Sequence, residues 1–136
     1  MENKLVVRIV SFSYHQTGYP ADASGNNGGF VFDCRFLPNP GREERYRNAT
    51  GRDAEVVEYF SQHHEMALFL TNVFYIVDAA VTNYQNRGFS HLMIAFGCTG
   101  GQHRSVYSAE NLAVHLRDQD VRVELEHIEL KKKGYI

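Results

Sequence analysis

The 136-residue sequence contains no tryptophan, only three prolines and only two cysteines. Two cysteines cannot form the disulfide framework of a small secreted domain, so Cys34 and Cys98 are expected to be free thiols in a reducing compartment. The formal net charge is −2, from 14 Lys and Arg against 16 Asp and Glu, which excludes a chain that is basic throughout. Any nucleic-acid surface must therefore be a local patch.

The sequence also lacks an apolar signal segment at its N-terminus and any uninterrupted apolar run as long as a membrane span. Internal repeats and low-complexity segments are absent as well. With 43% hydrophobic residues, a chain of this length can bury one core and is too short for two ordinary domains. We therefore expect one cytoplasmic domain over residues 1–136, with no membrane partner.

Strand and helix patterns alternate along the chain. Segments that are apolar, β-branched or alternating, as is typical of strands, cover residues 5–12, 30–36, 92–96 and 121–128. Apolar residues at three- and four-residue spacing predict helices over residues 53–60, 66–84 and 106–116. This order predicts an α/β fold, in which helices pack on a mostly parallel sheet.

Residues 97–105, with the sequence GCTGGQHRS, connect the third predicted strand to the last predicted helix. In an open parallel sheet, ligands bind beyond the carboxyl ends of the strands, which is where this segment lies. Gly100 and Gly101 allow a tight turn and a close approach of backbone N–H groups to a ligand. The start of the following helix adds unpaired N–H groups and the positive end of its dipole. The backbone here favours an anion.

The side chains of the same turn favour an anion too. Arg104 can bind a phosphate with two parallel hydrogen bonds, and His103 can add a proton or a hydrogen bond. Thr99 and Ser105 offer hydroxyl groups. A plain turn that uses glycine for packing would not need these four residues together. The Gly-Lys-Ser/Thr ending of a Walker loop is missing, so we expect no nucleotide hydrolysis.

A second interpretation of this turn is catalytic. Cys98, five intervening residues and Arg104 match the Cys-x5-Arg spacing of cysteine phosphatases, in which a thiolate attacks phosphorus. Asp22 or Asp33 would then be the general acid. Those enzymes usually have histidine before the cysteine, whereas this chain has Gly97, and a cysteine that ends a buried strand is more often a packing residue.

Longer motifs bring a family resemblance. DCRFLPNP over residues 33–40, Thr50-Gly51, and GCTGGQHRSVY over residues 97–107 resemble the C-terminal domain of the RapZ family, described as RNase adapters or nucleotide-binding proteins. The resemblance spans nearly the whole chain in the same order. It implies an amino-sugar phosphate or nucleotide ligand, and a small regulatory RNA as a further partner. The ligand-binding residues that it implies are Thr99, Gly100, Gly101, His103, Arg104 and Ser105, with Asp33 and Arg35 nearby.

The chain departs from the family in several places. It contains no P-loop, and Cys34 stands where the family motif more usually has a small aliphatic residue. The basic C-terminal region is reduced to residues 131–133, so we expect RNA binding only after self-association into a homo-oligomer. Residues 63–65 (His-His-Glu) lack a second pair of ligands, and we expect neither a metal nor a cofactor. The favoured function is a phosphate-ligand-binding module with a regulatory role, and the alternative is a cysteine-dependent phosphatase.

Overall fold

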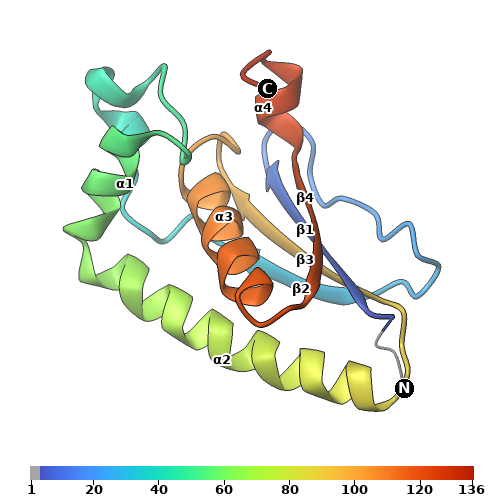
Figure 1. Ribbon diagram of the computed structural model, residues 1–136. Helices are drawn as coiled ribbons and strands as arrows, with labels where there is room; N and C mark the ends of the chain where they lie inside the picture. Colours follow the sequence, from blue (N-terminus) through green and yellow to red (C-terminus); the bar gives the residue numbers. More distant parts are fainter. Residues whose placement is uncertain (1–3) are drawn as a thin grey trace.

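Four strands form one sheet in the order β2–β3–β1–β4, and every neighbouring pair is parallel. The computed structural model describes residues 4–136 (Figure 1). The strands are β1 (Val6–Ser13), β2 (Gly29–Asp33), β3 (His91–Cys98) and β4 (Arg122–His127). Apart from its first residue, β3 is buried along its whole length, as its continuous apolar sequence predicts.

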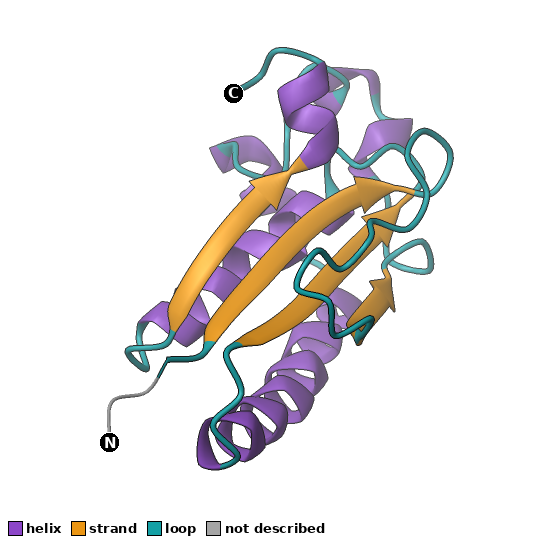
Figure 2. Ribbon diagram, turned by 90° about the vertical axis from the view of Figure 1, so that its right-hand side faces the viewer, coloured by secondary structure: helices purple, strands orange, loops and turns teal. Residues whose placement is uncertain are grey.

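The helices cover one face of this sheet (Figures 1 and 2). They are α1 (Ala54–Ser61), α2 (His64–Asn86) and α3 (Arg104–Arg117), and a five-residue helix, α4 (Ile128–Lys132), follows β4. Two short 3-10 helices, η1 (Pro40–Arg42) and η2 (Glu44–Tyr46), precede α1. The buried residues of α2 recur every three or four positions, which gives the helix one core-facing side: Met66, Leu70, Val73, Val77 and Val81.

The second face of the sheet carries a smaller apolar cluster of Val10, Phe12, Met93 and Ala95. No helix longer than α4 covers this cluster in the part of the chain that the structure describes. Instead, the loop over residues 14–28 crosses in front of the strands (Figure 2). Because alternate residues of a strand point to opposite faces, the neighbours of these residues face the larger core beneath α2 and α3.

The predicted α/β fold with a parallel sheet is confirmed, and two strand ends are corrected. The prediction of a strand to Phe36 was wrong, because a turn closed by a 3.2 Å hydrogen bond from Leu37 N–H to the Cys34 carbonyl follows Asp33. Phe36 is 69% exposed rather than part of the core. The last strand ends at His127, and part of the predicted basic tail is helical.

By length and composition, α2 could cross a membrane: it has 23 residues and a mean hydropathy of 1.4 over its most apolar window. The search for uninterrupted apolar runs missed this because Thr71, Asn72 and Asp78 divide the segment. Within residues 4–136 it is the one helix that meets this criterion. A helix that packs on a sheet also meets it, and α2 buries a regular apolar stripe in the core.

Candidate anion-binding site

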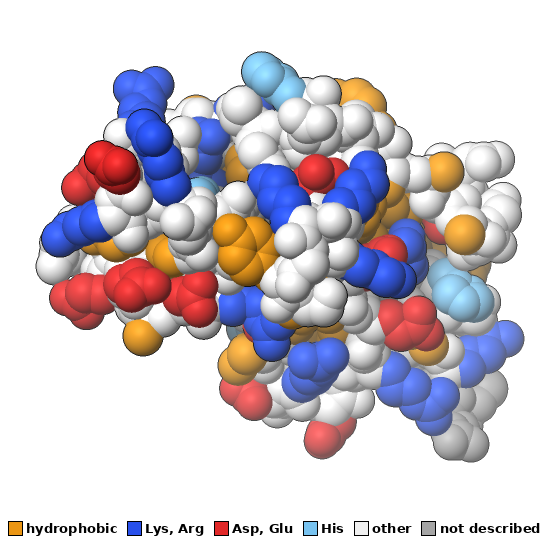
Figure 3. Space-filling view, turned by 90° about the horizontal axis from the view of Figure 1, so that it is seen from above, with side chains coloured by type: hydrophobic (Ala, Val, Ile, Leu, Met, Phe, Trp, Pro, Cys, Tyr) orange, Lys and Arg blue, Asp and Glu red, His pale blue; other side chains and the backbone are white. Residues whose placement is uncertain are grey.

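The turn between β3 and α3 lies at the carboxyl edge of the sheet. β3 ends at Cys98 and α3 begins at Arg104, so residues 99–103 form the turn itself. Figure 3 views this end of the molecule and shows Lys and Arg side chains spread over it, interspersed with Asp and Glu side chains. The turn therefore lies where ligands bind in open parallel sheets.

Two adjacent glycines of the turn have different surroundings. Gly101 has a φ of +68°, and a Cβ atom there would lie 2.7 Å from Glu129 Cγ and 3.0 Å from Ser13 N. Glycine is needed at this position for its backbone conformation and for its close packing. A Cβ atom on Gly100 would meet nothing within 4 Å, and Gly100 is exposed. The turn is thus packed at Gly101 and open at Gly100.

Hydrogen bonds to neighbouring segments fix the turn in place. Ser13 Oγ donates to the Thr99 carbonyl oxygen at 2.5 Å. Gln102 Nε2 donates to the carbonyl oxygens of Arg47 and Ala49, each at 2.7 Å. Lys133 Nζ donates to Gln102 Oε1 at 3.0 Å, so the C-terminal segment also contacts the turn. The site is preorganised by β1, by the segment after η2 and by the end of the chain.

The N-terminus of α3 points at the turn. His103 occupies the N-cap position, and its side chain makes no capping hydrogen bond there. The first N–H groups of a helix have no partner within the helix, and the helix dipole places partial positive charge at them. An anion at this position would accept hydrogen bonds from these N–H groups.

Arg104 is buried at the base of the site, with 4% of its surface exposed. Its Nη1 donates to the carbonyl oxygens of Arg35 at 2.7 Å and Leu37 at 3.3 Å, and its Nη2 donates to Thr99 Oγ1 at 3.4 Å. Its Nε is buried without a hydrogen-bond partner. Buried polar atoms are normally paired, so this unpaired donor is a second feature that suits an anionic acceptor.

His103 is 8% exposed, and its Nε2 lies 2.8 Å from the carbonyl oxygen of Tyr46. Because a carbonyl oxygen only accepts, Nε2 carries the proton in the neutral ring. Burial lowers the pKa of His103, and the carbonyl oxygens of Tyr46 and Ala49 offset part of that effect. The lowered pKa favours the neutral ring, whose hydrogen bond to the Tyr46 carbonyl holds η2 against the turn.

A cavity of about 270 Å³ opens between the turn and the loop that follows β2. The turn and the end of β3 contribute Cys98, Thr99, Gly100, Gln102, His103 and Arg104. The loop contributes Asn39, Gly41 and Arg47. Of the residues expected from the sequence, Thr99, Gly100, His103 and Arg104 line this cavity, together with Cys98 of the alternative interpretation.

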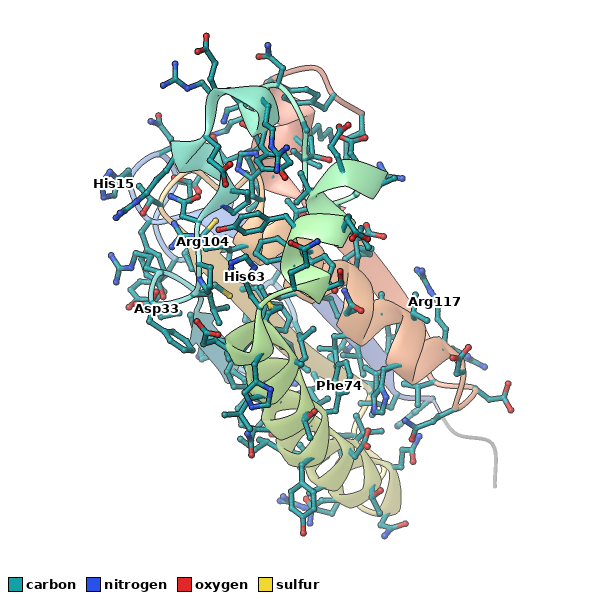
Figure 4. The ribbon with its side chains drawn as sticks, turned by 90° about the vertical axis from the view of Figure 1, so that its left-hand side faces the viewer. His15, Asp33, His63, Phe74, Arg104 and Arg117 are labelled. Carbon is teal, nitrogen blue, oxygen red and sulfur yellow. The ribbon has the colours of Figure 1, made fainter. Side chains whose placement is uncertain are left out.

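The remaining expected residues lie near the cavity without lining it. Asp33 and Arg35 form an ion pair with each other, with 2.9 Å from Nε to Oδ1 and 2.6 Å from Nη2 to Oδ2. The Arg35 guanidinium also lies 3.8 Å from the centre of the Tyr14 ring. Figure 4 shows Asp33 and Arg104 at the same end of the molecule. Ser105 is fully buried, and its Oγ accepts a 3.1 Å hydrogen bond from the Cys98 thiol. Gly101 packs against Glu129 and Ser13.

Four cavity residues were not among those expected from the sequence: Asn39, Gly41, Arg47 and Gln102. Asn39 belongs to the DCRFLPNP motif of the family resemblance, but it was not named as a ligand-binding residue. Its side chain accepts a 2.9 Å hydrogen bond from Gly41 N–H and so starts η1. The Asn-Pro-Gly sequence at residues 39–41 is typical of a turn and could have been named as a second candidate loop. Arg47 belongs to no motif that sequence alone would identify.

Within residues 4–136, no group of three or more His, Cys, Asp or Glu side chains is arranged to hold a metal ion. His63 Nδ1 instead lies 2.7 Å from the carbonyl oxygen of Tyr59. The His63 and Tyr59 rings are also in contact, with their centres 4.3 Å apart. His63 therefore has a local structural partner.

Comparison with known proteins identifies the family of this chain. The model of the RapZ C-terminal domain matches residues 5–131. A nucleotide-binding protein of Fervidobacterium nodosum is 37% identical over 126 residues, covering 93% of this chain and 43% of its own length. An RNase adapter protein RapZ of Hamiltonella defensa is 39% identical over 132 residues, covering 97% of this chain and 44% of its own length.

A further relative, a nucleotide-binding protein of Acidobacterium capsulatum, is 40% identical over 94% of this chain and 40% of its own length. The chain thus spans less than half the length of these curated relatives. The match itself covers almost every element described above, from β1 to α4. This chain belongs to the RapZ C-terminal domain family.

Proposed function

We propose that this domain binds a phosphorylated small molecule, such as a sugar phosphate or a nucleotide, in the cavity between the β3–α3 turn and the loop after β2. The observation that carries the proposal is the meeting of three donor sets at one cavity. These are the start of α3, where the N-cap residue makes no side-chain cap, the buried Arg104 guanidinium, and Arg47, an exposed residue that lines the cavity. Each favours an anion, and together they suit a phosphate group.

The size of the cavity limits the ligand. A volume of about 270 Å³ lies just below the usual range for ligand pockets, roughly 300 to 1,000 Å³. It suits one phosphate with an attached sugar better than a whole dinucleotide. Relatives named as nucleotide-binding proteins support a ligand with a phosphate and a sugar. The amino-sugar phosphate implied by the family resemblance fits the same description.

Binding without chemistry is favoured over the phosphatase interpretation by the candidate general acids. The Arg35 guanidinium lowers the pKa of Asp33, and the Ser24 backbone N–H lowers that of Asp22. A general acid needs a pKa near the working pH, so both carboxyl groups are poorly suited to protonating a leaving group. Asp22 also lines a different cavity, between the 20–29 loop and the sheet.

We further propose that the domain acts as a cytoplasmic regulatory module. A relative named RNase adapter supports an adapter role in which RNA backbone phosphates are a second class of ligand. Arg104 is buried and Lys133 donates to Gln102, so these cations offer little to RNA phosphates, and RNA binding is expected to depend on a homo-oligomer that repeats the patch.

Isothermal calorimetry and amide chemical-shift titration with inorganic phosphate, glucosamine 6-phosphate and AMP would test the binding proposal. We expect shifts at residues 99–105 and affinity in the millimolar range or tighter. Arg47→Ala should weaken binding by about 10- to 100-fold, the effect of losing a charge-assisted hydrogen bond. The matched control is Arg45→Ala, because Arg45 lies in η2 but does not line the cavity.

Two results would count against the proposal. One is the absence of binding by all three compounds at 10 mM or below, on the order of the weakest useful affinity. The other is a set of shifts that clusters away from the β3–α3 turn. Equal weakening by Arg47→Ala and Arg45→Ala would show that the effect is a general charge effect rather than contact with the ligand.

A further inference from the structure

The two cysteines of the chain end neighbouring strands at the same level of the sheet. β2 and β3 pair with Asp33 opposite Gly97, so Cys34 and Cys98 are the next residues along. The Cys34 N–H still donates to the Gly97 carbonyl at 2.7 Å, which keeps the two backbones together past the end of β2. Neighbouring strands lie about 4.8 Å apart, within the roughly 4.4–6.8 Å that separates the Cα atoms of a disulfide.

The two thiols also face the same turn of α3. Cys98 Sγ donates to Ser105 Oγ at 3.1 Å, and Cys34 Sγ donates to Ser108 Oγ at 3.8 Å. Ser105 and Ser108 are three residues apart on the helix and therefore lie on one side of it. Both cysteines are free thiols in this structure. Strand register and helix contacts thus agree that the side chains share one buried space.

From this juxtaposition we propose that Cys34 and Cys98 form a reversible intramolecular disulfide when the protein meets a hydroperoxide. The pair is a modification site at the edge of the anion cavity. Disulfides in reducing compartments are usually transient and redox-sensing, which is the behaviour expected here.

The order of events follows from access. Cys98 lines the cavity and is 2% exposed, so the route of a molecule as small as hydrogen peroxide to this thiol runs through the cavity. Cys34 is fully buried, and burial together with the nearby Cys98 sulfur raises the pKa of its thiol. Cys34 is therefore slow to react with a soluble oxidant and is placed to resolve an oxidised Cys98.

The chemistry balances in two steps. Cys98 Sγ attacks one oxygen of the peroxide, the O–O bond breaks, and the hydroxide that leaves takes up the thiol proton as water. Cys34 Sγ then attacks the sulfur of the Cys98 sulfenic acid, and the S–O bond breaks as an S–S bond forms. The displaced hydroxyl group leaves with the Cys34 proton as a second water. Two thiols lose two electrons, and one peroxide is reduced to two waters.

Oxidation would alter the anion cavity, and this consequence rests on the proposed function. Cys98 directly precedes Thr99, and Cys34 directly precedes Arg35, whose carbonyl oxygen accepts the Arg104 guanidinium. The bridge would withdraw the Cys98 sulfur from Ser105 and draw together the two segments that position Arg104. We expect phosphate to bind about tenfold more weakly to the oxidised protein, as for the loss of one hydrogen bond.

The test uses the whole chain, first reduced and then treated with increasing hydrogen peroxide under native conditions. We expect both thiols to disappear together, a peptide map that joins Cys34 to Cys98 within one molecule, and full recovery of both thiols with dithiothreitol. Cys34→Ala is the matched variant. Without the resolving thiol, its Cys98 should stop at a sulfenic acid that dimedone traps, or proceed to sulfinic acid.

Two outcomes would overturn the disulfide: wild type that keeps both thiols at peroxide doses that oxidise the urea-unfolded chain, or cross-links formed only between molecules. The wild-type peptide map decides the matter even if Cys34→Ala fails to fold. Inorganic phosphate at 10 mM or more, on the order of a weak ligand's dissociation constant, should slow the oxidation of Cys98. A disulfide that forms at the same rate with and without phosphate would keep this inference and count against the proposed anion site.

Discussion

Arg104 of α3 and Arg35 after β2 are joined by a 2.7 Å hydrogen bond from the Arg104 guanidinium to the Arg35 backbone carbonyl. The same guanidinium nitrogen reaches the Leu37 carbonyl at 3.3 Å, while Nε has no partner. One side chain therefore closes the loop after β2 and also supplies an unused donor beside the cavity. Its structural and ligand-binding roles have to be separated experimentally.

Replacing Arg104 should lower both stability and anion affinity. In Arg104→Ala, the carbonyl oxygens of Arg35 and Leu37 lose their donor, so we expect the free energy of unfolding to fall by about 2–4 kcal/mol. Phosphate affinity should fall by about 1.5–3 kcal/mol in variants that remain folded. Urea denaturation and calorimetry measure the two effects. Arg45→Ala, an exposed substitution, should change stability by about 0.5 kcal/mol or less.

Alanine should destabilise the fold at Gly101 and leave its stability unchanged at Gly100, the adjacent glycine of the turn. Gly101→Ala places a Cβ atom against Glu129 and Ser13 at a φ of +68°, so we expect a loss of about 1–3 kcal/mol. Gly100→Ala meets no atom within 4 Å and should fold with wild-type stability. Because Gly100 lines the cavity, its variant should still weaken phosphate binding. Thermal unfolding of the pair would show equal losses if the turn were not packed as described.

Cys98→Ser separates a binding module from a phosphatase. Under reducing conditions we expect the variant to bind phosphate with nearly wild-type affinity, because serine preserves the hydrogen bond to Ser105. A cysteine phosphatase would instead lose its nucleophile and nearly all of its activity. Hydrolysis of p-nitrophenyl phosphate by wild type, abolished in Cys98→Ser, would establish the catalytic alternative.

Protonation of His103 should destabilise the fold in mild acid. Burial lowers its pKa below the unfolded value of 6.5, so the unfolded chain binds the proton first as pH falls. The stabilisation from neutral His103 is complete above about pH 6.5 and is lost as pH falls toward its folded pKa, by at most about 1.4 kcal/mol per pH unit.

Urea denaturation at pH 7.5, 6.5 and 5.5 would measure this slope. His103→Gln cannot titrate and keeps a side-chain N–H for the Tyr46 carbonyl, so its stability should vary less with pH over this range. A variant slope as steep as that of wild type would assign the acid sensitivity to other groups.

RNA binding by one copy of the domain should be weak and should have a shallow salt dependence. Lys132 lies 3.7 Å from Glu129, Lys133 donates to Gln102, and Arg104 is buried, so these three cations are only partly available to RNA phosphates. Residues 131–133 at full contact would give a log–log salt slope of roughly −2 for single-stranded RNA. Gel-shift titrations at several salt concentrations, with light scattering, would measure slope and oligomeric state together. Tight binding by a strict monomer would contradict the multivalent account.

The sequence predicts the regular parts of this fold because their patterns are local. The apolar residues of α2 recur every three or four positions, and those of β3 form one continuous run. Both elements form where these patterns predict them. The limit of β2 was not predictable by pattern, because the alternation of apolar residues continues to Phe36 while the backbone turns at Cys34. Alternation says which side chains share a face, but it cannot say where a strand stops pairing.

The candidate site divides in the same way. Residues 99–104 are contiguous, so one motif identifies them and the structure places most of them at one cavity. Arg47 comes from a segment more than 50 residues away, brought there by the two hydrogen bonds of Gln102 to the Arg47 and Ala49 carbonyls. The pairing of Asp33 with Arg35 likewise depends on side-chain rotamers, which no spacing rule specifies. Neither a contact between distant segments nor the choice of a side-chain rotamer can be derived from a sequence pattern.

The loop over residues 14–28 is rich in glycine and polar residues, as connecting loops are. It nevertheless covers part of one face of the sheet (Figure 2). Phe12 is fully buried, and its ring contacts Tyr14 and Tyr19 at 4.8 and 5.9 Å between ring centres. Shortening or nicking this loop would therefore leave Val10, Phe12 and Met93 facing water. Such a chain would have an apolar sheet surface and a tendency to aggregate, so insertions for labelling or engineering belong elsewhere on the molecule.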